Sequence, residues 1–282
     1  MRVLFIPTRG SDRLLRKERL KKMAQWFDSV LVFARDFKFP EGSLPSNTKV
    51  WYTKSLNLAE KRSIGTSWAF DQGADLCYTI DDDVVGDYEY MFARLELAML
   101  RNPFLGSCRA ITSTNMFYYG HGKGEPYSGV FEPRIALSAY PSQVYVLRRE
   151  AYEETKGYYN IRVLEDIDIG AQMVEAAWVN AYLPFAAYTV DRRQYGHGKK
   201  AEEGGIPPAD QEADYPLAAV LLRKRNPSAI KKVDLFTRSN GTIGQRVKFD
   251  WQYYADRCTE RWGRQYPMEL QELFAKHLRR RG

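Results

Sequence analysis

The sequence has 282 residues, of which 44% are hydrophobic and 27% charged, and its formal net charge is +7. This length favours one large domain with an extension over two equal domains. The apolar stretches are strand-sized, which excludes the run of roughly 20 residues that a membrane span needs. The N-terminus runs straight into an apolar strand, so we expect no signal peptide and a soluble, cytoplasmic protein.

The three cysteines exclude two further classes of protein. Cys77, Cys108 and Cys258 are far apart, odd in number and never arranged as a CxxC pair. This pattern argues against a disulfide framework and against a structural zinc site, and it indicates a reducing compartment.

Positive charge is concentrated near the C-terminus. Residues 221–282 contain 15 Lys and Arg against 6 Asp and Glu, so this segment carries +9 and the rest of the chain −2. Such asymmetry predicts a polyanionic partner, because Lys and Arg placed at phosphates release counterions. The alternative is a solvated helix face with a disordered basic tail over Arg279–Arg281.

The first hundred residues alternate between strand and helix patterns. Apolar residues 2–6 predict a buried strand that ends in a turn at Pro7-Thr8-Arg9-Gly10. A helix capped by Ser11 or Asp12 should follow, with apolar side chains at helical spacing between Leu14 and Phe27. The next predicted elements are strands at Ser29–Ala34 and Lys49–Tyr52, a helix at Asn57–Phe70 and a strand at Leu76–Ile80.

This alternation predicts an α/β fold with a mainly parallel sheet. In such sheets the ligand crevice lies outside the carboxyl ends of the strands. Arg9, Asn57 and the run Asp81-Asp82-Asp83 all fall at that edge. The later part of the chain is predicted to contain a helix-to-strand return at Asn102–Thr112, a long loop at Asn115–Pro133, a strand at Gln143–Leu147, a helix at Arg149–Lys156 stopped by Gly157, an amphipathic helix at Glu165–Trp178 and a mobile linker at Glu202–Pro208.

Two acidic clusters stand at element ends. Asp81, Asp82 and Asp83 crowd three carboxylates directly after a strand, where a hard cation such as Mg²⁺ or Mn²⁺ would relieve the repulsion; turn and N-cap roles are the alternative. Glu165-Asp166-Ile167-Asp168 opens the amphipathic helix, where the helix dipole favours acidic residues whatever the function. Together the clusters could supply a metal site and a general base.

Five motifs in order resemble the glycosyltransferases of the GT-A fold, over about residues 2 to 200. They are Ile6-Pro-Thr-Arg9, the helix start Asn57–Arg62, the strand-DxD string Thr79-Ile-Asp-Asp-Asp-Val84, Val146-Leu-Arg-Arg-Glu-Ala151 and the ED-containing helix Val163-Leu-Glu-Asp-Ile-Asp-Ile-Gly-Ala-Gln172. Within that group the chain is most similar to the phage and kinetoplastid enzymes associated with TET/JBP-type base hydroxylases. The resemblance implies a Rossmann-like catalytic domain over residues 1–205, and we expect a basic, mainly helical extension over 206–282 packing on it.

The resemblance also implies an inverting transfer from a nucleotide sugar, expected to be a UDP-sugar, with one Mn²⁺ or Mg²⁺ ion as cofactor. Asp81 and Asp83 would handle the donor ribose and the metal, His197 would close the metal site, and Asp166 would be the general base; an ordinary loop histidine is the alternative for His197. The further expected donor-binding residues are Thr8, Arg9, Asn57, Arg62 and Asp82, and the expected acceptor-binding residues are His121, Lys123 and Glu165. Arg9 and Arg62 could instead pair with the Asp triplet.

The expected acceptor is a hydroxymethylated pyrimidine base in DNA, which would make this a phage gene product acting in the host cytoplasm. The C-terminal segment interleaves aromatic and basic residues, a mixture that can stack on bases and meet phosphates, and the Asn115–Pro133 loop could shape a pocket for an extruded base. The same aromatics can equally pack inward. The alternatives are a glycan, lipid or protein acceptor, a two-metal nuclease or nucleotidyltransferase, and a nucleic-acid-binding protein without activity.

Overall fold

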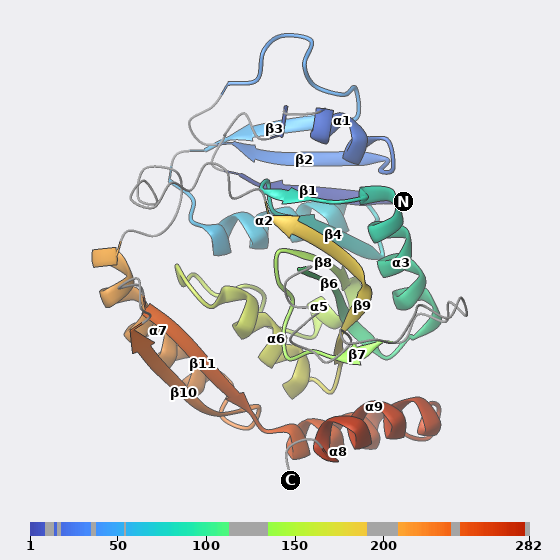
Figure 1. The fold of residues 1–282 in the computed structure, drawn as a ribbon, viewed down its shortest axis with the longest axis vertical. Coiled ribbons are helices and arrows are strands. Elements are labelled where there is room, and N and C mark those ends of the chain that lie inside the picture. Colours follow the sequence, from blue (N-terminus) through green and yellow to red (C-terminus); the bar gives the residue numbers. More distant parts are fainter. Residues whose placement is uncertain are drawn as a thin grey trace, which may run out of the picture.

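A mixed β-sheet forms the centre of the molecule and carries helices on both faces (Figure 1). The structure is a computed structural model, and it describes residues 1–8, 14–15, 18–34, 38–53, 55–112, 135–190, 208–237 and 243–279. In chain order the elements are β1 (Val3–Pro7), α1 (Arg19–Ala24), β2 (Ser29–Ala34), β3 (Thr48–Tyr52), α2 (Leu58–Asp71), β4 (Leu76–Ile80), β5 (Val84–Val85), α3 (Tyr88–Arg101), β6 (Leu105–Thr112), β7 (Ala136–Leu137), β8 (Val144–Arg148), α5 (Arg149–Glu153), α6 (Glu165–Glu175), β9 (Val179–Val190), α7 (Pro208–Arg225), β10 (Ile230–Thr237), β11 (Ile243–Phe249), α8 (Trp251–Trp262) and α9 (Pro267–Arg279).

The sheet has the order β3-β2-β1-β4-β8-β6-β9-β5, with β7 pairing β9. The first four strands in this order run parallel, as the βαβ alternation predicts. β8 enters antiparallel between β4 and β6, and β6 and β9 pair in parallel. The predicted α/β fold with a mixed, mainly parallel sheet is confirmed.

Alternate residues of each central strand face two different apolar cores. Val3 and Phe5 of β1 pack on the side of α2, α5 and part of α6. Leu4 and Ile6 pack with α1 and α3 on the other side. Because side chains alternate across a strand and both faces are covered, the strand reads as a continuous apolar run.

The helix α2 begins where the sequence predicts it. The Asn57 side chain accepts a hydrogen bond from Glu60 N, and the Glu60 side chain accepts one from Asn57 N, which makes a capping box. Gly65 lies on the buried face of this helix, and a Cβ there would come within 2.6 Å of the Phe5 ring. The glycine therefore allows α2 to approach β1 closely, which keeps the helix start next to the strand end.

Three helices are shorter than their sequence patterns suggest. α1 starts only at Arg19, after Glu18 in the left-handed region at φ 56°, and the proposed caps Ser11 and Asp12 lie outside the described residues. α5 ends at Glu153, ahead of the predicted end at Lys156. α6 ends at Glu175 because Ala177 takes φ 61°.

The end of α6 is a Schellman motif. Ala177 N donates to Val174 O at 3.0 Å and Trp178 N donates to Met173 O at 2.8 Å. The chain thereby reverses direction, and Trp178 becomes a core residue that is 1% exposed instead of the last residue of the helix.

The C-terminal elements α7 to α9, coloured orange to red, lie along one side of the molecule (Figure 1). They include an antiparallel hairpin, β10–β11, that the sequence analysis did not predict. Some aromatic side chains of this segment pack inward: Tyr254 is fully buried, and Trp262 Nε1 donates to Ala177 O at 2.7 Å. Phe236 on the hairpin is 45% exposed. Of the two roles open to Tyr254 and Trp262, inward packing is the one that the structure shows.

None of the helices in the described parts of the chain combines the length and apolar character that crossing a bilayer requires. Cys77, Cys108 and Cys258 are buried and form no disulfide.

We predict that Gly65→Ala destabilises the fold. Overpacking a core costs about 1–3 kcal/mol, which outweighs the ~1 kcal/mol that Ala usually gains over Gly in a helix. Chemical denaturation should therefore show a lower free energy of unfolding. Combining Gly65→Ala with Phe5→Leu, which removes the ring, should cost less than the sum of the two single changes. A stabilising Gly65→Ala would contradict the close packing of α2 on β1.

Candidate active site

The acidic clusters meet at the edge of the sheet where β1 and β4 end. Thr8 follows β1, and Asp81, Asp82 and Asp83 follow β4. The starts of α2 and α6 reach the same place, because Arg62 of α2 contacts both Asp81 and Glu165. Polar residues from four elements thus converge at the edge that the sequence predicts for ligand binding.

The register between β1 and β4 sets the position of the aspartates. The strands pair in parallel with Phe5 opposite Thr79. The same offset continues past the strand ends and brings Thr8 beside Asp82, whose Oδ2 accepts a hydrogen bond from Thr8 Oγ1. Since a slip of one residue would turn each side chain to the opposite face, the backbone pairing fixes which carboxylate faces Thr8.

A buried guanidinium connects the two acidic clusters. Arg62 is 3% exposed; its Nη1 donates to Glu165 Oε1 at 2.6 Å, and its Nη2 lies 3.5 Å from Asp81 Oδ1. Burial alone would lower the pKa of Arg62, but Tyr145, Glu165 and Asp81 around it raise the pKa well above its ordinary value. The group therefore stays charged. Of the two roles open to Arg62, pairing with the acidic residues is the one observed, and contact with a nucleotide stays a prediction.

The start of α6 has a strained backbone. Leu164, its N-cap residue, has φ 64° and ψ 17°, in the left-handed region that a bulky side chain seldom adopts. Such strain costs on the order of 1–3 kcal/mol and clusters at functional sites. It aims the first turn of the helix, with Glu165 and Asp166, at the sheet edge.

Glu165 and Asp166 hold their protons more tightly than ordinary carboxyl groups. Burial raises the pKa of Glu165 to about 7, with Arg62 opposing and Asp166 adding to the rise. Burial also raises the pKa of Asp166, against the opposing effects of Arg62, the Ile167 N–H and Arg109. Asp166 is half-buried, and its Oδ1 accepts a hydrogen bond from Ile167 N at 2.9 Å. A raised pKa suits a general base.

Asn57 and Lys61 hold the sheet edge and the loop before α6 together. Lys61 is buried and its Nζ donates to Thr8 O at 2.8 Å. Asn57 donates from Nδ2 to Asn160 Oδ1, and Asn160 Nδ2 donates to Glu60 Oε1 at 3.1 Å. Asn57 is thus a cap and a tether of this loop, and its predicted contact with the donor stays a prediction.

Sequence reasoning missed two polar residues of this region, and it did not separate Asp168 from the other acidic residues of α6. Lys61 was overlooked beside Arg62, although it lies one residue away on a buried helix face. Arg109 lies in β6, is 8% exposed and acts electrostatically on Asp166; a lone charge in an otherwise apolar strand was the available signal. Asp168 is fully buried and faces away from the sheet edge, toward α7.

Several predicted residues lie outside the described part of the chain. They are Arg9, His121, Lys123 and His197, together with the whole of the predicted 115–133 loop and residues 202–207 of the predicted linker. Their roles in donor, acceptor and metal binding stay predictions.

The carboxylates around Asp81 fit a divalent cation. Burial raises the pKa of Asp81 to about 8, with Arg62 opposing and with Asp83 and Asp82 adding to the rise. Asp81 Oδ1 is buried and accepts no hydrogen bond from any described residue. The only cation near this oxygen among the described residues is Arg62, whose Nη2 lies 3.5 Å away, so a hard cation would add positive charge beside it. Mg²⁺ typically takes one or two carboxylates together with substrate phosphates and water.

The described residues include no group of three or more His, Cys, Asp and Glu side chains that could hold a metal ion by themselves. The third predicted ligand, His197, lies outside them. The described site thus offers the carboxylates of Asp81 and Asp83, and phosphate oxygens of a ligand would have to complete the coordination.

Comparison with protein-family models gives no match, and no curated protein matches the sequence. Solved structures do resemble the fold. The chain is similar to a mannosyltransferase from Pyrobaculum calidifontis in complex with GDP-Man and Mn²⁺, with a TM-score of 0.50 and 13% identity over 80% of this chain and 70% of that one.

A second similar structure is glucosyl-3-phosphoglycerate synthase from Mycobacterium tuberculosis with Mn²⁺, UDP and phosphoglyceric acid. The TM-score is 0.50 and the identity 11% over 88% of this chain and 86% of that one. GalNAc-T7 with UDP, GalNAc and Mn²⁺ follows at a TM-score of 0.48 and 12% identity, and the match covers 67% of this chain and 43% of that one. The first two likenesses confirm the predicted GT-A type of fold.

We predict that stability falls as the pH rises through the titration of Asp81 and Glu165. Their folded pKa values of about 8 and about 7 exceed the unfolded values of about 4, so the folded state holds these protons more tightly. The stabilisation is complete below about pH 4 and is lost by about pH 8.

Denaturation curves recorded between pH 5 and pH 8 test this dependence. Asp81→Asn should flatten the decline, because the amide cannot ionise, whereas Asp71→Asn at the exposed end of α2 should leave it unchanged. Equal slopes for Asp81→Asn and the wild type would show that Asp81 does not titrate in this range.

Proposed function

We propose that this protein is a metal-dependent glycosyltransferase that moves a sugar from a nucleoside diphosphate sugar to an acceptor hydroxyl. The observation that carries the proposal is the meeting of both acidic clusters on Arg62, at the ligand edge of a GT-A type fold. The mannosyltransferase and the phosphoglycerate synthase that share the fold hold GDP-Man or UDP with Mn²⁺. These ligands guide the choice of donors to test.

Asp166 is the proposed general base. Its carboxylate would take the proton of the acceptor hydroxyl while the hydroxyl oxygen attacks the anomeric carbon. The bond from that carbon to the diphosphate oxygen breaks on the opposite side, so the configuration inverts. The raised pKa of Asp166 supports this role, and Glu165 next to it is engaged by Arg62.

Asp81 and Asp83 would hold the divalent cation together with the donor diphosphate. The cation, when bound, neutralises the charge that develops on the leaving nucleoside diphosphate. Thr8 positions Asp82 beside this pair, and Lys61 fixes the Thr8 carbonyl. Arg62 keeps a positive charge between the metal side and the base side, so that both acidic clusters remain close without mutual repulsion.

A two-metal nuclease or nucleotidyltransferase has less support. A two-metal site needs carboxylates that bridge or surround both ions. The cation lying between the two clusters here is the Arg62 guanidinium, which occupies the place where a second metal ion would have to lie.

Two features of the C-terminal segment led us to expect a hydroxymethylated base in DNA as the acceptor: its aromatic residues and its positive charge. Only the positive charge still supports this acceptor. Tyr254 and Trp262 pack inward, so stacking of a base on these two rings does not support this acceptor. The excess positive charge of residues 221–282 still does, with Lys232, Arg246 and Lys248 exposed on the hairpin. A glycan, lipid or protein acceptor would leave the catalytic residues unchanged.

We predict that Asp166→Asn and Asp83→Ala separate chemistry from donor binding. Asp166→Asn should bind donor like the wild type but turn over about 10²- to 10⁴-fold more slowly, since the base is lost. Asp83→Ala should lose metal-stimulated donor binding. Calorimetric titration with UDP-glucose or GDP-mannose and Mn²⁺, combined with an assay of nucleoside diphosphate release, measures both. Near-normal turnover by Asp166→Asn would remove it from the mechanism.

A second prediction concerns the acceptor. Nucleoside diphosphate release from a panel of nucleotide sugars with Mn²⁺ should rise when the correct acceptor is added, because its hydroxyl attacks the donor faster than water does. The panel should include DNA with 5-hydroxymethylcytosine or 5-hydroxymethyluracil and unmodified DNA as the matched control. A mass gain on the modified DNA would establish it as acceptor. Nucleoside diphosphate release that does not change when DNA is added would be compatible with a glycosyltransferase but would contradict DNA as its acceptor.

A further inference from the structure

One acidic residue of α6 takes no part in the proposed chemistry. Asp168 is 0% exposed, whereas Asp166 is half-buried at the sheet edge. Two residues along a helix correspond to a rotation of about 200°, so the two carboxylates lie on opposite sides of α6. Burying a carboxylate is costly unless other groups bond to it. Asp168 is therefore a structural anchor on the back of the helix that presents Asp166.

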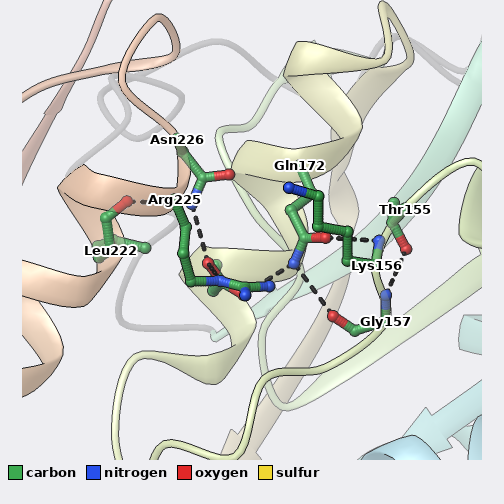
Figure 2. Close-up of polar contacts among 8 residues, drawn as sticks. Thr155, Lys156, Gly157, Gln172, Leu222, Arg225 and Asn226 are labelled. Carbon is green, nitrogen blue, oxygen red and sulfur yellow. Dashed lines mark hydrogen bonds and ion pairs between the residues drawn. The ribbon is translucent and has the colours of Figure 1, made fainter.

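The end of α7 supplies the groups that bond to this carboxylate. Asn226 Nδ2 donates to Asp168 Oδ1 at 2.8 Å, and Arg225 Nε lies 3.3 Å from the same oxygen. Gln172, one turn further along α6, donates from Nε2 to Asp168 Oδ2 at 2.8 Å. Figure 2 shows Arg225 and Asn226 reaching from α7 toward Gln172 on α6. Two segments that are far apart in the sequence are thus locked side by side.

The same group of side chains holds the loop that leads into α6. Gln172 Nε2 also donates to Gly157 O at 3.1 Å, and Lys156 N donates to Gln172 Oε1 at 2.7 Å (Figure 2). The guanidinium of Arg225 lies 4.1 Å from the ring centroid of Tyr159. This loop ends in the strained Leu164, directly before Glu165 and Asp166. α7 therefore contacts both the helix behind the proposed base and the loop in front of it.

We propose that Arg225 and Asn226 are positioning residues that set the orientation of Asp166 through Asp168 and the loop before α6. The inference rests on the proposed function and deepens it, since it gives the C-terminal segment a role in the chemical step. A helix start held in a strained conformation needs support from outside, and the contacts with Asp168 and Tyr159 supply it. A small displacement of a catalytic group can cost about a hundredfold in rate.

The position of Asn226 allows its bond to Asp168 but leaves its own side-chain oxygen without a hydrogen bond from the described residues. The residue is fully buried. A buried unsatisfied carbonyl is unfavourable, so an Asn at this position indicates that the bond from Nδ2 to Asp168 matters more. Asn226 also donates to Leu222 O, four residues earlier, at 3.1 Å.

Asn102 offers a matched control for this local cap. It follows α3 and donates from Nδ2 to Ala98 O at 2.8 Å, four residues earlier, as Asn226 does to Leu222. It makes no contact with α6 that the structure describes. Asn102→Ala therefore removes a similar helix-end bond without touching the support of Asp166.

The experiment compares Asn226→Ala with Asn102→Ala in the full-length protein. Nucleoside diphosphate release is measured with Mn²⁺ and whichever of UDP-glucose and GDP-mannose the wild type uses. We expect kcat of Asn226→Ala to fall about ten- to a hundredfold, with the Kd of the donor within about twofold of the wild type.

Thermal melting establishes that each variant is folded. Should Asn226→Ala not fold, Arg225→Ala replaces it, because that side chain is 19% exposed and its loss removes the contact with Tyr159 as well as with Asp168. A folded variant whose kcat matches that of Asn102→Ala would overturn the inference while the proposed function stands. A wild type that turns over no nucleotide sugar would remove the proposed function and the inference with it.

Discussion

The contacts of the Arg62 guanidinium with Asp81 and Glu165 are the interaction on which the site depends. A buried guanidinium is expensive to desolvate, and only close carboxylates and hydrogen bonds offset that cost. Arg62 finds them in Asp81 from the end of β4 and Glu165 from the start of α6. Removing the guanidinium would leave the half-buried Asp81 and the buried Glu165 without their common partner.

Backbone pairing supplies the rigidity that such a crowded site requires. The parallel register of β1 with β4 places Thr8 beside Asp82, and the capping box of α2 sets where Arg62 emerges from the helix. Neither arrangement depends on a ligand. Strands and a helix therefore keep the aspartates close together despite their mutual repulsion. Burial and the neighbouring aspartates raise the pKa of Asp81, and a bound cation would favour its ionised form instead.

The sequence predicted the elements whose signals are local, and it missed contacts between distant segments. The strand before Asp81 and the helix start at Asn57 were readable because apolar runs and capping residues are local features. The bond from Asn226 to Asp168 joins residues 58 positions apart and has no local signal. The β10–β11 hairpin was missed although Arg246-Val247-Lys248-Phe249 alternates charged and apolar residues. In β10 the irregularity between Ile230 and Lys232 interrupts that alternation.

The first turn of α6 shows why composition alone could not assign the site. Its three acidic residues are equally favoured by the helix dipole, and their sequence gives no order of importance. Each step of about 100° around the helix sends them to different surroundings: Glu165 to the Arg62 guanidinium, Asp166 to the half-buried sheet edge, and Asp168 to the amide of Asn226. Two of the carboxylates are bonded to other parts of the chain, and this supports the proposal that Asp166 is the general base.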